Sequence, residues 1–222
     1  MSISTDLKAI FPKYNHGYHR DCVTIAETDP QAKVKSLTWT NSDFHFVDTK
    51  MVKDMTSFFR SSNSSNIFNW DCDGIVLFEN EGRKYFFLLE LKSSFDSTDL
   101  YHAMDQIISS YIKTNMILHL TINYRNDDYI FEGFIACYPP KEDYKMQLRR
   151  KLQLPVTSKY KTDAEFAAEL YFNKKCEIKA TECEKIRGIK LGNNCLFNNL
   201  RFNLIEVPRD QNSINVDVIP YL

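Results

Sequence analysis

Two carboxylates and one ammonium group stand beside the most apolar segments of the chain. Asp73 directly precedes the run Gly74 to Phe78, and Glu90 and Lys92 stand two residues apart near the end of the run Tyr85 to Lys92. Because side chains alternate along a strand, Glu90 and Lys92 point to the same face. Charged groups at the end of a buried strand are costly unless they pair with one another or hold a metal. The pattern therefore indicates a site of oxygen ligands with a lysine beside it.

The chemistry of such a site suits a hard divalent cation. Two carboxylates, a backbone carbonyl and several waters are the ligands that Mg²⁺, or Mn²⁺ in its place, prefers. The metal would polarise a phosphodiester and help to generate hydroxide, and Lys92 would orient or deprotonate that water or offset the charge on the phosphorane. Asp71 is the alternative to Asp73 as a ligand. Asp73 is preferred because it directly precedes the apolar run, whereas Asp71 is expected to point to the opposite face.

The elements that must position these residues are predicted by periodicity. Two apolar runs separated by a turn-like segment predict a hairpin, and its second strand, apolar on both faces, belongs in the middle of a sheet. An amphipathic helix capped by Thr98 or Asp99 follows, and then a strand from Tyr129 to Tyr138 that ends at a pair of prolines. The fold class is therefore α/β, with a central mixed β-sheet flanked by helices. Further strands are predicted at residues 34–40, 44–47, 203–207 and 214–219, and further helices at residues 49–60, 141–152 and 162–173.

Asp73, a hairpin and the segment Glu90-Leu91-Lys92 resemble the D-(x)n-ExK signature of the PD-(D/E)xK nuclease superfamily, the restriction-endonuclease-like fold. Cys72 stands where the family name has a proline. The resemblance covers roughly residues 45 to 140, and it implies an αβββαβ core and Mg²⁺-dependent cleavage of phosphodiester bonds. It also implies that Asp73, Glu90 and the backbone carbonyl of Leu91 hold the metal, and that Lys92 is the catalytic lysine.

The resemblance extends to the helix after the lysine. In branches similar to the nuclease domain of RecB, this helix carries a glutamine that faces the site and a tyrosine four residues later. Gln106 matches the glutamine and is taken as an assisting catalytic residue, but Tyr111 follows it after five residues rather than four. Many members also carry an acidic residue before the first strand of the motif, for which Asp54 and Glu27 are the alternatives.

The distribution of charge says more about partners than the total does. With 28 basic and 29 acidic residues the net charge is −1, which argues against a protein that coats nucleic acid and leaves room for a local basic face. Residues 141–190 hold thirteen Lys or Arg and eight Asp or Glu, an excess of five positive charges. One face of the helix predicted there could contact phosphates, although a solvated face is an equal alternative. Its basic residues are Lys141, Lys145, Arg149, Arg150 and Lys151.

The length of 222 residues fits a single nuclease-like domain, in which residues 141–222 form a C-terminal α/β extension to the core. No run approaches the ~20 apolar residues of a membrane-spanning helix. The first residues lack the pattern of a secretory signal. The six cysteines lack the spacing of a zinc module or a disulfide framework. These features predict a cytoplasmic protein that does not contact a membrane. If its substrate is a duplex, a two-fold homodimer is favoured, because one such site cuts one strand.

Three hypotheses follow from the sequence. The first is a Mg²⁺-dependent nuclease, acting on DNA in a restriction, defence or repair role. The second is a non-catalytic member of the same fold that binds nucleic acid or protein. The third is an unrelated α/β protein in which Glu90 and Lys92 form a surface salt bridge worth at most ~1 kcal/mol.

Overall fold

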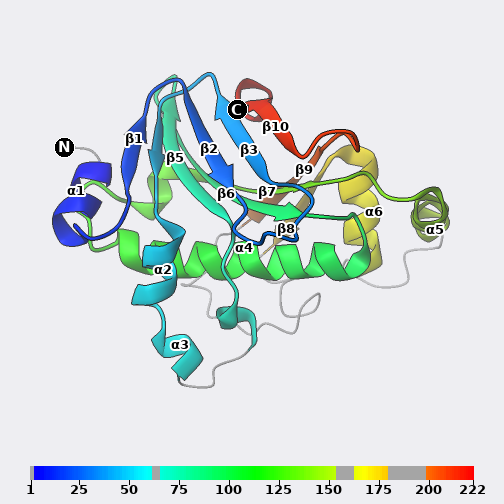
Figure 1. Cartoon of the computed structure of the whole chain (residues 1–222), viewed down its shortest axis with the longest axis horizontal. Helices are drawn as coiled ribbons and strands as arrows, with labels where there is room; N and C mark the ends of the chain where they lie inside the picture. Colours follow the sequence, from blue (N-terminus) through cyan, green and yellow to red (C-terminus); the bar gives the residue numbers. More distant parts are fainter. Residues whose placement is uncertain (1–2, 62–65, 154–162, 180–198) are drawn as a thin grey trace.

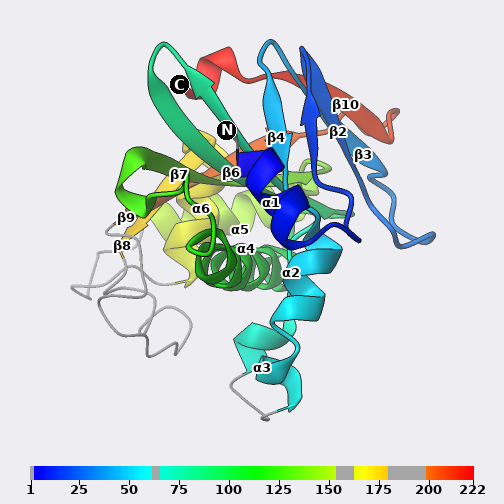
Figure 2. The same ribbon diagram turned by 90° about the vertical axis from the view of Figure 1, so that its left-hand side faces the viewer.

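The protein is built on a large mixed β-sheet with helices on one face and a small second sheet on the other (Figures 1 and 2). The computed structural model describes residues 3–61, 66–153, 163–179 and 199–222. Within these residues the large sheet has seven strands in the order β1-β4-β5-β6-β7-β9-β8, and the small sheet has the order β10-β3-β2. The fold class predicted from the sequence, α/β with a central mixed sheet, is confirmed. The strands are β1 (Gly17–His19), β2 (Cys22–Ala26), β3 (Ser36–Thr40), β4 (Phe44–Phe46), β5 (Gly74–Asn80), β6 (Arg83–Lys92), β7 (Tyr129–Cys137), β8 (Lys175–Lys179), β9 (Asn199–Glu206) and β10 (Ser213–Asp217).

The helices gather mainly below the large sheet in the view of Figure 1, and the longest of them runs along its width. The α-helices are α1 (Ile3–Ile10), α2 (Thr49–Met55), α3 (Phe58–Ser61), α4 (Ser97–Leu118), α5 (Glu142–Leu152) and α6 (Asp163–Asn173); short 3₁₀ helices are η1 (Asn66–Asn69), η2 (Asn126–Asp128) and η4 (Ile219–Tyr221). None of the helices in the described part of the chain has both the length and the apolar character needed to cross a membrane.

The predicted hairpin is present and forms the centre of the large sheet. Strands β5 and β6 pair antiparallel from Gly74 opposite Leu89 to Asn80 opposite Arg83. The two residues of the turn, Glu81 and Gly82, have φ values of 50° and 77°, as a tight turn that matches the twist of the strands requires. Strand β6 also pairs with β7 on its other side, so its backbone is bonded along both edges. This is why a strand without polar alternation is stable here.

Helix α4 connects β6 to β7, which run parallel. Parallel neighbours need such a crossover, and the helix buries its apolar stripe against the sheet. The side chain of Asp96 caps the helix by accepting from the N–H of Asp99 at 3.0 Å. The prediction that Thr98 or Asp99 caps the helix was therefore wrong, because the cap lies two residues before Thr98 and three before Asp99.

The large sheet has a hydrophobic cluster on each face. Residues of β6 divide between the two by alternation: Phe86 and Leu88 pack with α4, and Phe87 and Leu89 pack against the small sheet around Trp39. Both ends of the chain contribute to the small sheet, since β10 pairs parallel with β3 and β2 pairs antiparallel with it. The central strands are thus covered on both faces.

The C-terminal third completes both sheets. Strand β9 pairs parallel with β7, β8 forms the edge beyond it, and β10 joins the small sheet. The segment predicted as an extension to the core therefore supplies an inner strand of the large sheet. The helix predicted at residues 49–60 is divided into α2 and α3, because the hydroxyl of Thr56 bonds back to the carbonyl of Val52 at 2.6 Å and ends the first helix.

Candidate metal-dependent active site

The C-terminal end of β6 carries the residues that the sequence predicted as catalytic. Glu90 and Lys92 follow Phe86 and Leu88 on the face of the sheet that α4 covers, as alternation along the strand predicts. Lys92 is the last residue of the strand, and the chain then turns into α4. The strand thus delivers a carboxylate and an ammonium to the boundary between the core and the surface.

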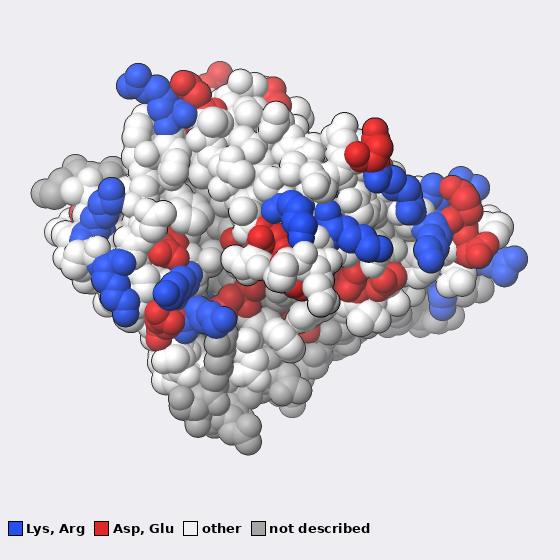
Figure 3. All heavy atoms as spheres, viewed as in Figure 1, with Lys and Arg blue, Asp and Glu red and all other residues white. Residues whose placement is uncertain are grey.

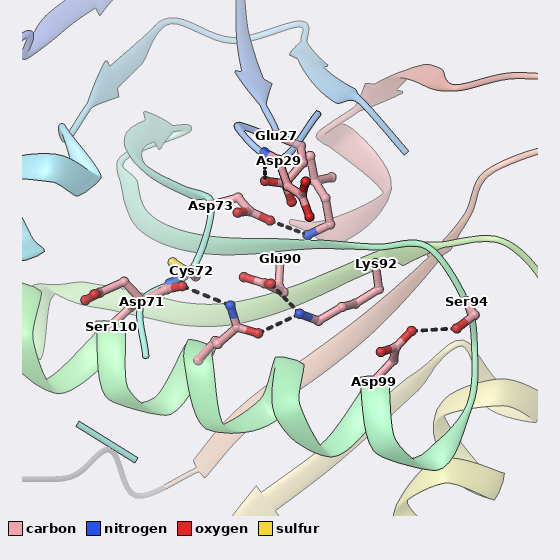
Figure 4. A network of polar contacts seen from close by, with 12 residues as sticks. Glu27, Asp29, Asp71, Cys72, Asp73, Glu90, Lys92, Ser94, Asp99 and Ser110 are labelled. Carbon is pink, nitrogen blue, oxygen red and sulfur yellow. Dashed lines mark hydrogen bonds and ion pairs between the residues drawn. The ribbon is translucent and has the colours of Figure 1, made fainter. Parts of the chain in front are cut away.

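Hydrogen bonds hold the lysine in one position (Figure 4). The Nζ of Lys92 donates to Oε1 of Glu90 at 2.7 Å and to Oε1 of Gln106, from α4, at 2.6 Å. The amide nitrogen of Gln106 donates in turn to the backbone carbonyl of Asp71 at 3.0 Å. Because both ends of the Gln106 amide are bonded, its oxygen must face the lysine. The structure therefore brings Glu90, Lys92 and Gln106 together as the sequence predicted.

Asp73 reaches the same end of β6 from the start of β5, but on the other side of the strand. Its backbone N–H donates to the carbonyl of Leu89, and its Oδ2 accepts the N–H of Leu91 at 2.7 Å. The carboxylate of Asp73 thus accepts a backbone hydrogen bond from β6 that a carbonyl of the neighbouring strand would otherwise accept. Asp73 does so one residue before β5 begins. Figure 4 shows it on the opposite side of the β6 ribbon from Glu90, close to the strand end. Its place therefore serves the sheet as well as the candidate site.

The electrostatics of the site disfavour two ionised carboxylates in the absence of a cation. Burial raises the pKa of Asp73 to about 7, against the opposing effects of the Leu91 hydrogen bond and the positive charge of Lys92. Burial raises the pKa of Glu90 well above its usual value, and the nearby Asp73 adds to the effect. Glu27, in the loop after β2, raises the pKa of both groups further. A bound cation would reverse these shifts, because it favours the ionised forms.

The donor groups are of the chemical types that bind a magnesium ion, while the carboxylates of Asp73 and Glu90 lie on opposite sides of the β6 ribbon (Figure 4). Oε2 of Glu90 is buried and has no hydrogen-bond partner among the described residues, an arrangement that needs an explanation in a native site. The carbonyl of Leu91 lies on the same side of β6 as the N–H that meets Asp73, because the two groups of one residue in a strand point the same way. In the described ranges no group of three or more His, Cys, Asp or Glu side chains is placed to hold a metal. Mg²⁺ needs only one or two carboxylates, since it keeps several waters.

Asp71, the alternative to Asp73 as a ligand, forms an ion pair with a buried lysine. Its Oδ1 accepts from Nζ of Lys113, a lysine of α4 with 1% of its side chain exposed, at 2.8 Å. The same ammonium donates to the carbonyl of Trp70 at 2.9 Å, and the hydroxyl of Ser110 accepts the N–H of Cys72 at 2.7 Å. Helix α4 therefore fixes the segment that leads into β5. Lys113 and Ser110 were not predicted from the sequence. The pattern that could have indicated them is the presence of polar residues within the predicted amphipathic helix.

Tyr111 lies outside the candidate site. Its hydroxyl donates to Asn126 at 3.2 Å, and its ring packs beside Phe86 and Phe131 in the core. Tyr111 follows Gln106 by five residues rather than the four of the RecB-like pattern, and its side chain therefore points in a different direction from the helix. Asp54, one of the two alternatives for the upstream acidic residue, accepts from the hydroxyl of Tyr14 at 3.0 Å. Glu27 is the alternative that acts on the charges of Asp73 and Glu90.

A cleft of about 720 Å³ opens beside Asp73. Residues of β2 and α2 line it, together with the segment from Asp71 to Asp73. Lys50 and Lys53 of α2 also line it. On the face of the molecule shown in Figure 3, acidic and basic side chains lie beside one another near the centre, and further Lys and Arg side chains lie toward both ends. Asp48 and Asp54 also line the cleft, so side chains of both charges face it.

The basic residues predicted to contact phosphates lie on α5. This helix packs on α6 and lies at the right-hand end of the molecule in Figure 1. Lys141 is the residue before its first turn, and Arg149, Arg150 and Lys151 lie in its last turn. Lys145 pairs with Glu142 at 2.7 Å, which neutralises the middle of the face. Their contact with nucleic acid stays a prediction.

No family model, no curated protein and no solved structure matches this chain. The function must therefore be argued from the site itself.

Proposed function

We propose that this protein is a Mg²⁺-dependent nuclease that hydrolyses phosphodiester bonds, with DNA as its substrate. The observation that carries the proposal is the environment of Glu90. One oxygen of this buried carboxylate has no hydrogen-bond partner among the described residues, and the other accepts from Nζ of Lys92 at 2.7 Å. A surface salt bridge does not account for this pair, because the side chain of Glu90 is only 2% exposed. Metal sites and catalytic sites are where such perturbed groups gather.

We further infer that β4, β5, β6, α4 and β7 form a restriction-endonuclease-like core. In support, β4, β5 and β6 pair antiparallel in sequence order, and α4 leads to β7, which is parallel to β6. In further support, Asp73 directly precedes β5, and Glu90 and Lys92 lie at the end of β6. The arrangement departs from the αβββαβ order in two respects: β1, β2 and β3 stand between α1 and β4, and α2 and α3 stand between β4 and β5.

The residues of the site have distinct tasks in this proposal. Asp73, Glu90 and the carbonyl of Leu91 would hold Mg²⁺, or Mn²⁺, which supplies positive charge next to the phosphate and lowers the pKa of water. Lys92 would orient the attacking water and stabilise the negative charge that develops on the phosphate. Gln106 would keep Lys92 directed at the site through its bond at 2.6 Å. No covalent nucleophile is needed.

A binding role on the same scaffold is the second candidate function. It is favoured by the hydrogen bonds of Lys92, because its ammonium already donates to both Glu90 and Gln106 and is thus engaged within the protein. In that case the protein would bind nucleic acid or another protein without cutting.

Two measurements decide between the candidates. Purified protein should cut single-stranded or duplex DNA when Mg²⁺ or Mn²⁺ is added and should stop in EDTA, and Lys92→Ala should abolish cutting while circular dichroism shows an unchanged fold. Calorimetry should detect binding of the metal to the wild type and a loss of that binding in Glu90→Gln. Absence of metal binding by the wild type would refute the catalytic proposal, and metal binding without cutting would favour the binding role.

A further inference from the structure

An exposed tryptophan stands at the edge of the candidate site. The protein has two tryptophans; Trp39, in β3 of the small sheet, is fully buried against Phe87 and Phe134 of the large sheet, whereas Trp70 is 42% exposed. Trp70 is nevertheless held firmly. Its carbonyl accepts from the buried Lys113 at 2.9 Å, and its ring lies perpendicular to the His102 ring, with a centroid distance of 4.3 Å and an angle of 85°. A large part of this aromatic residue is thus exposed to solvent at a position that these two contacts fix.

This tryptophan borders a shallow hollow of about 450 Å³ on the surface of α4. The hollow is lined by Trp70, Thr98, Tyr101, His102 and Asp105. It lies near the candidate catalytic groups, because Asp71, the residue after Trp70, accepts a hydrogen bond from the amide nitrogen of Gln106 through its backbone carbonyl at 3.0 Å. It also adjoins the cleft beside Asp73, since Asp71 lines that cleft and follows Trp70 directly in the chain. A chain molecule that passes the candidate site can therefore reach both concavities.

The chemistry of the two concavities differs. The hollow combines aromatic rings with the carboxylate of Asp105, which repels phosphate but can accept a hydrogen bond from the amino group of a base. The cleft is lined by Lys50 and Lys53 and also by the carboxylates of Asp48, Asp54, Asp71 and Asp73. Three of these carboxylates already accept hydrogen bonds, from Asn15, Tyr14 and Lys113, whereas neither lysine has an ion-pair partner among the residues that the structure describes. The two lysines are therefore the groups in the cleft that a phosphate backbone would contact, and a base suits the hollow.

We propose that Trp70 is a stacking platform for an unpaired base, so that the substrate is a single-stranded nucleic acid or a single-stranded end. This inference rests on the proposed function, and it specifies which substrate the site takes. The bases of an intact duplex are stacked on one another, and their faces are not available to a side chain on the protein surface. Stacking on an aromatic ring is tolerant of sequence, because every base has a π-face.

The pair of tryptophans provides a direct test. Wild-type protein in EDTA, where it cannot cut, is titrated with a single-stranded DNA of about 12 nucleotides, a length within the range of known site sizes. The same sequence is then used as a blunt duplex. The fluorescence of Trp70 should be quenched by the single strand and not by the duplex, while Trp39 provides a constant background. Trp70→Phe should bind the single strand without this quenching, which assigns the signal to Trp70.

Affinity is measured in parallel by anisotropy of the labelled oligonucleotide. Trp70→Ala should weaken binding of the single strand by about 5- to 150-fold, the range for the loss of one stacked base, and Trp70→Phe should recover most of it. Phe58→Ala is the matched control, because Phe58 is also an exposed aromatic residue, at 50%, and does not line the hollow. It should bind like the wild type.

The outcomes separate the inference from the proposed function. If the protein cuts DNA in a metal-dependent way and Trp70→Ala binds and cuts like the wild type, the platform is refuted and the nuclease stands. Equal binding of duplex and single strand, with equal dependence on Trp70, would also refute it. If stacking at Trp70 is observed and no cutting occurs, the inference holds and the protein is a single-strand-binding member of its fold. If neither form of DNA binds, both proposals fail.

Discussion

Replacing Asp73 with asparagine changes the charge of the candidate site and leaves its shape almost unchanged. The amide oxygen can still accept the N–H of Leu91, as Oδ2 does at 2.7 Å. Burial raises the pKa of Asp73 from 3.8 to about 7, so the folded protein without metal holds this proton more tightly than the unfolded chain does. The stability that the proton contributes is fully present below about pH 4 and is lost as the pH rises through about 7. The variant has no such group and should lack this loss.

The size of the effect follows from the shift. About three pH units correspond to ~4 kcal/mol at ~1.4 kcal/mol per unit. Part of this stabilisation is already lost by pH 5, because the loss begins near pH 4. Solvent screening at the partly exposed end of the strand reduces the remaining stabilisation, so about 2 kcal/mol should be lost between about pH 5 and pH 8. We therefore expect the free energy of unfolding of Asp73→Asn, relative to the wild type, to rise by about 2 kcal/mol over that range, or about 4–8 °C in Tm for a chain of this length.

The assay is urea denaturation in EDTA, followed by circular dichroism at the two pH values. Magnesium supplies the control: at a concentration a hundredfold above its Kd it would stabilise the wild type by about 2.7 kcal/mol and not the variant, so the advantage of Asp73→Asn should disappear. An equal difference between variant and wild type at both pH values would show that Asp73 carries no tightly held proton. The argument that the site is built for a cation would then lose its electrostatic basis.

Three further substitutions test the other contacts. Lys92→Ala should lower the rate of metal-dependent DNA cleavage by at least about 100-fold, as the loss of a general acid or base does, and a smaller effect in single-turnover assays would assign the lysine a structural role. Gln106→Ala should lower kcat and leave the Kd for Mg²⁺ measured by calorimetry unchanged, because Gln106 orients the lysine and holds no metal; a weakened Kd would contradict this. Asp71→Ala should cost about 3–5 kcal/mol in the free energy of unfolding, since it leaves the ammonium of Lys113 buried without its carboxylate, and a matched Lys113→Met should cost less.

Much of the fold around the site could be predicted from local sequence. The β5–β6 hairpin carries its own signals, because strands of β-branched and aromatic residues flank a turn with glycine at a position of positive φ. The apolar stripe of α4 likewise reports the face that it buries. Strands β1, β2 and β8 were not predicted, since they are short edge strands of three to five residues whose pairing depends on distant partners.

The identity of the candidate catalytic residues was determined by the sequence alone, because alternation along one strand places Glu90 and Lys92 together and the hairpin brings Asp73 to the same end. Only the tertiary structure decided how these groups are held. Asp71 and Asp73 have different partners because Lys113 pairs with Asp71 alone of the two. Lys113 is about forty residues further along the chain and reaches Asp71 because α4 crosses the sheet. The exposure of Trp70 and the burial of Trp39 likewise follow from packing between segments distant in sequence, which no local pattern specifies.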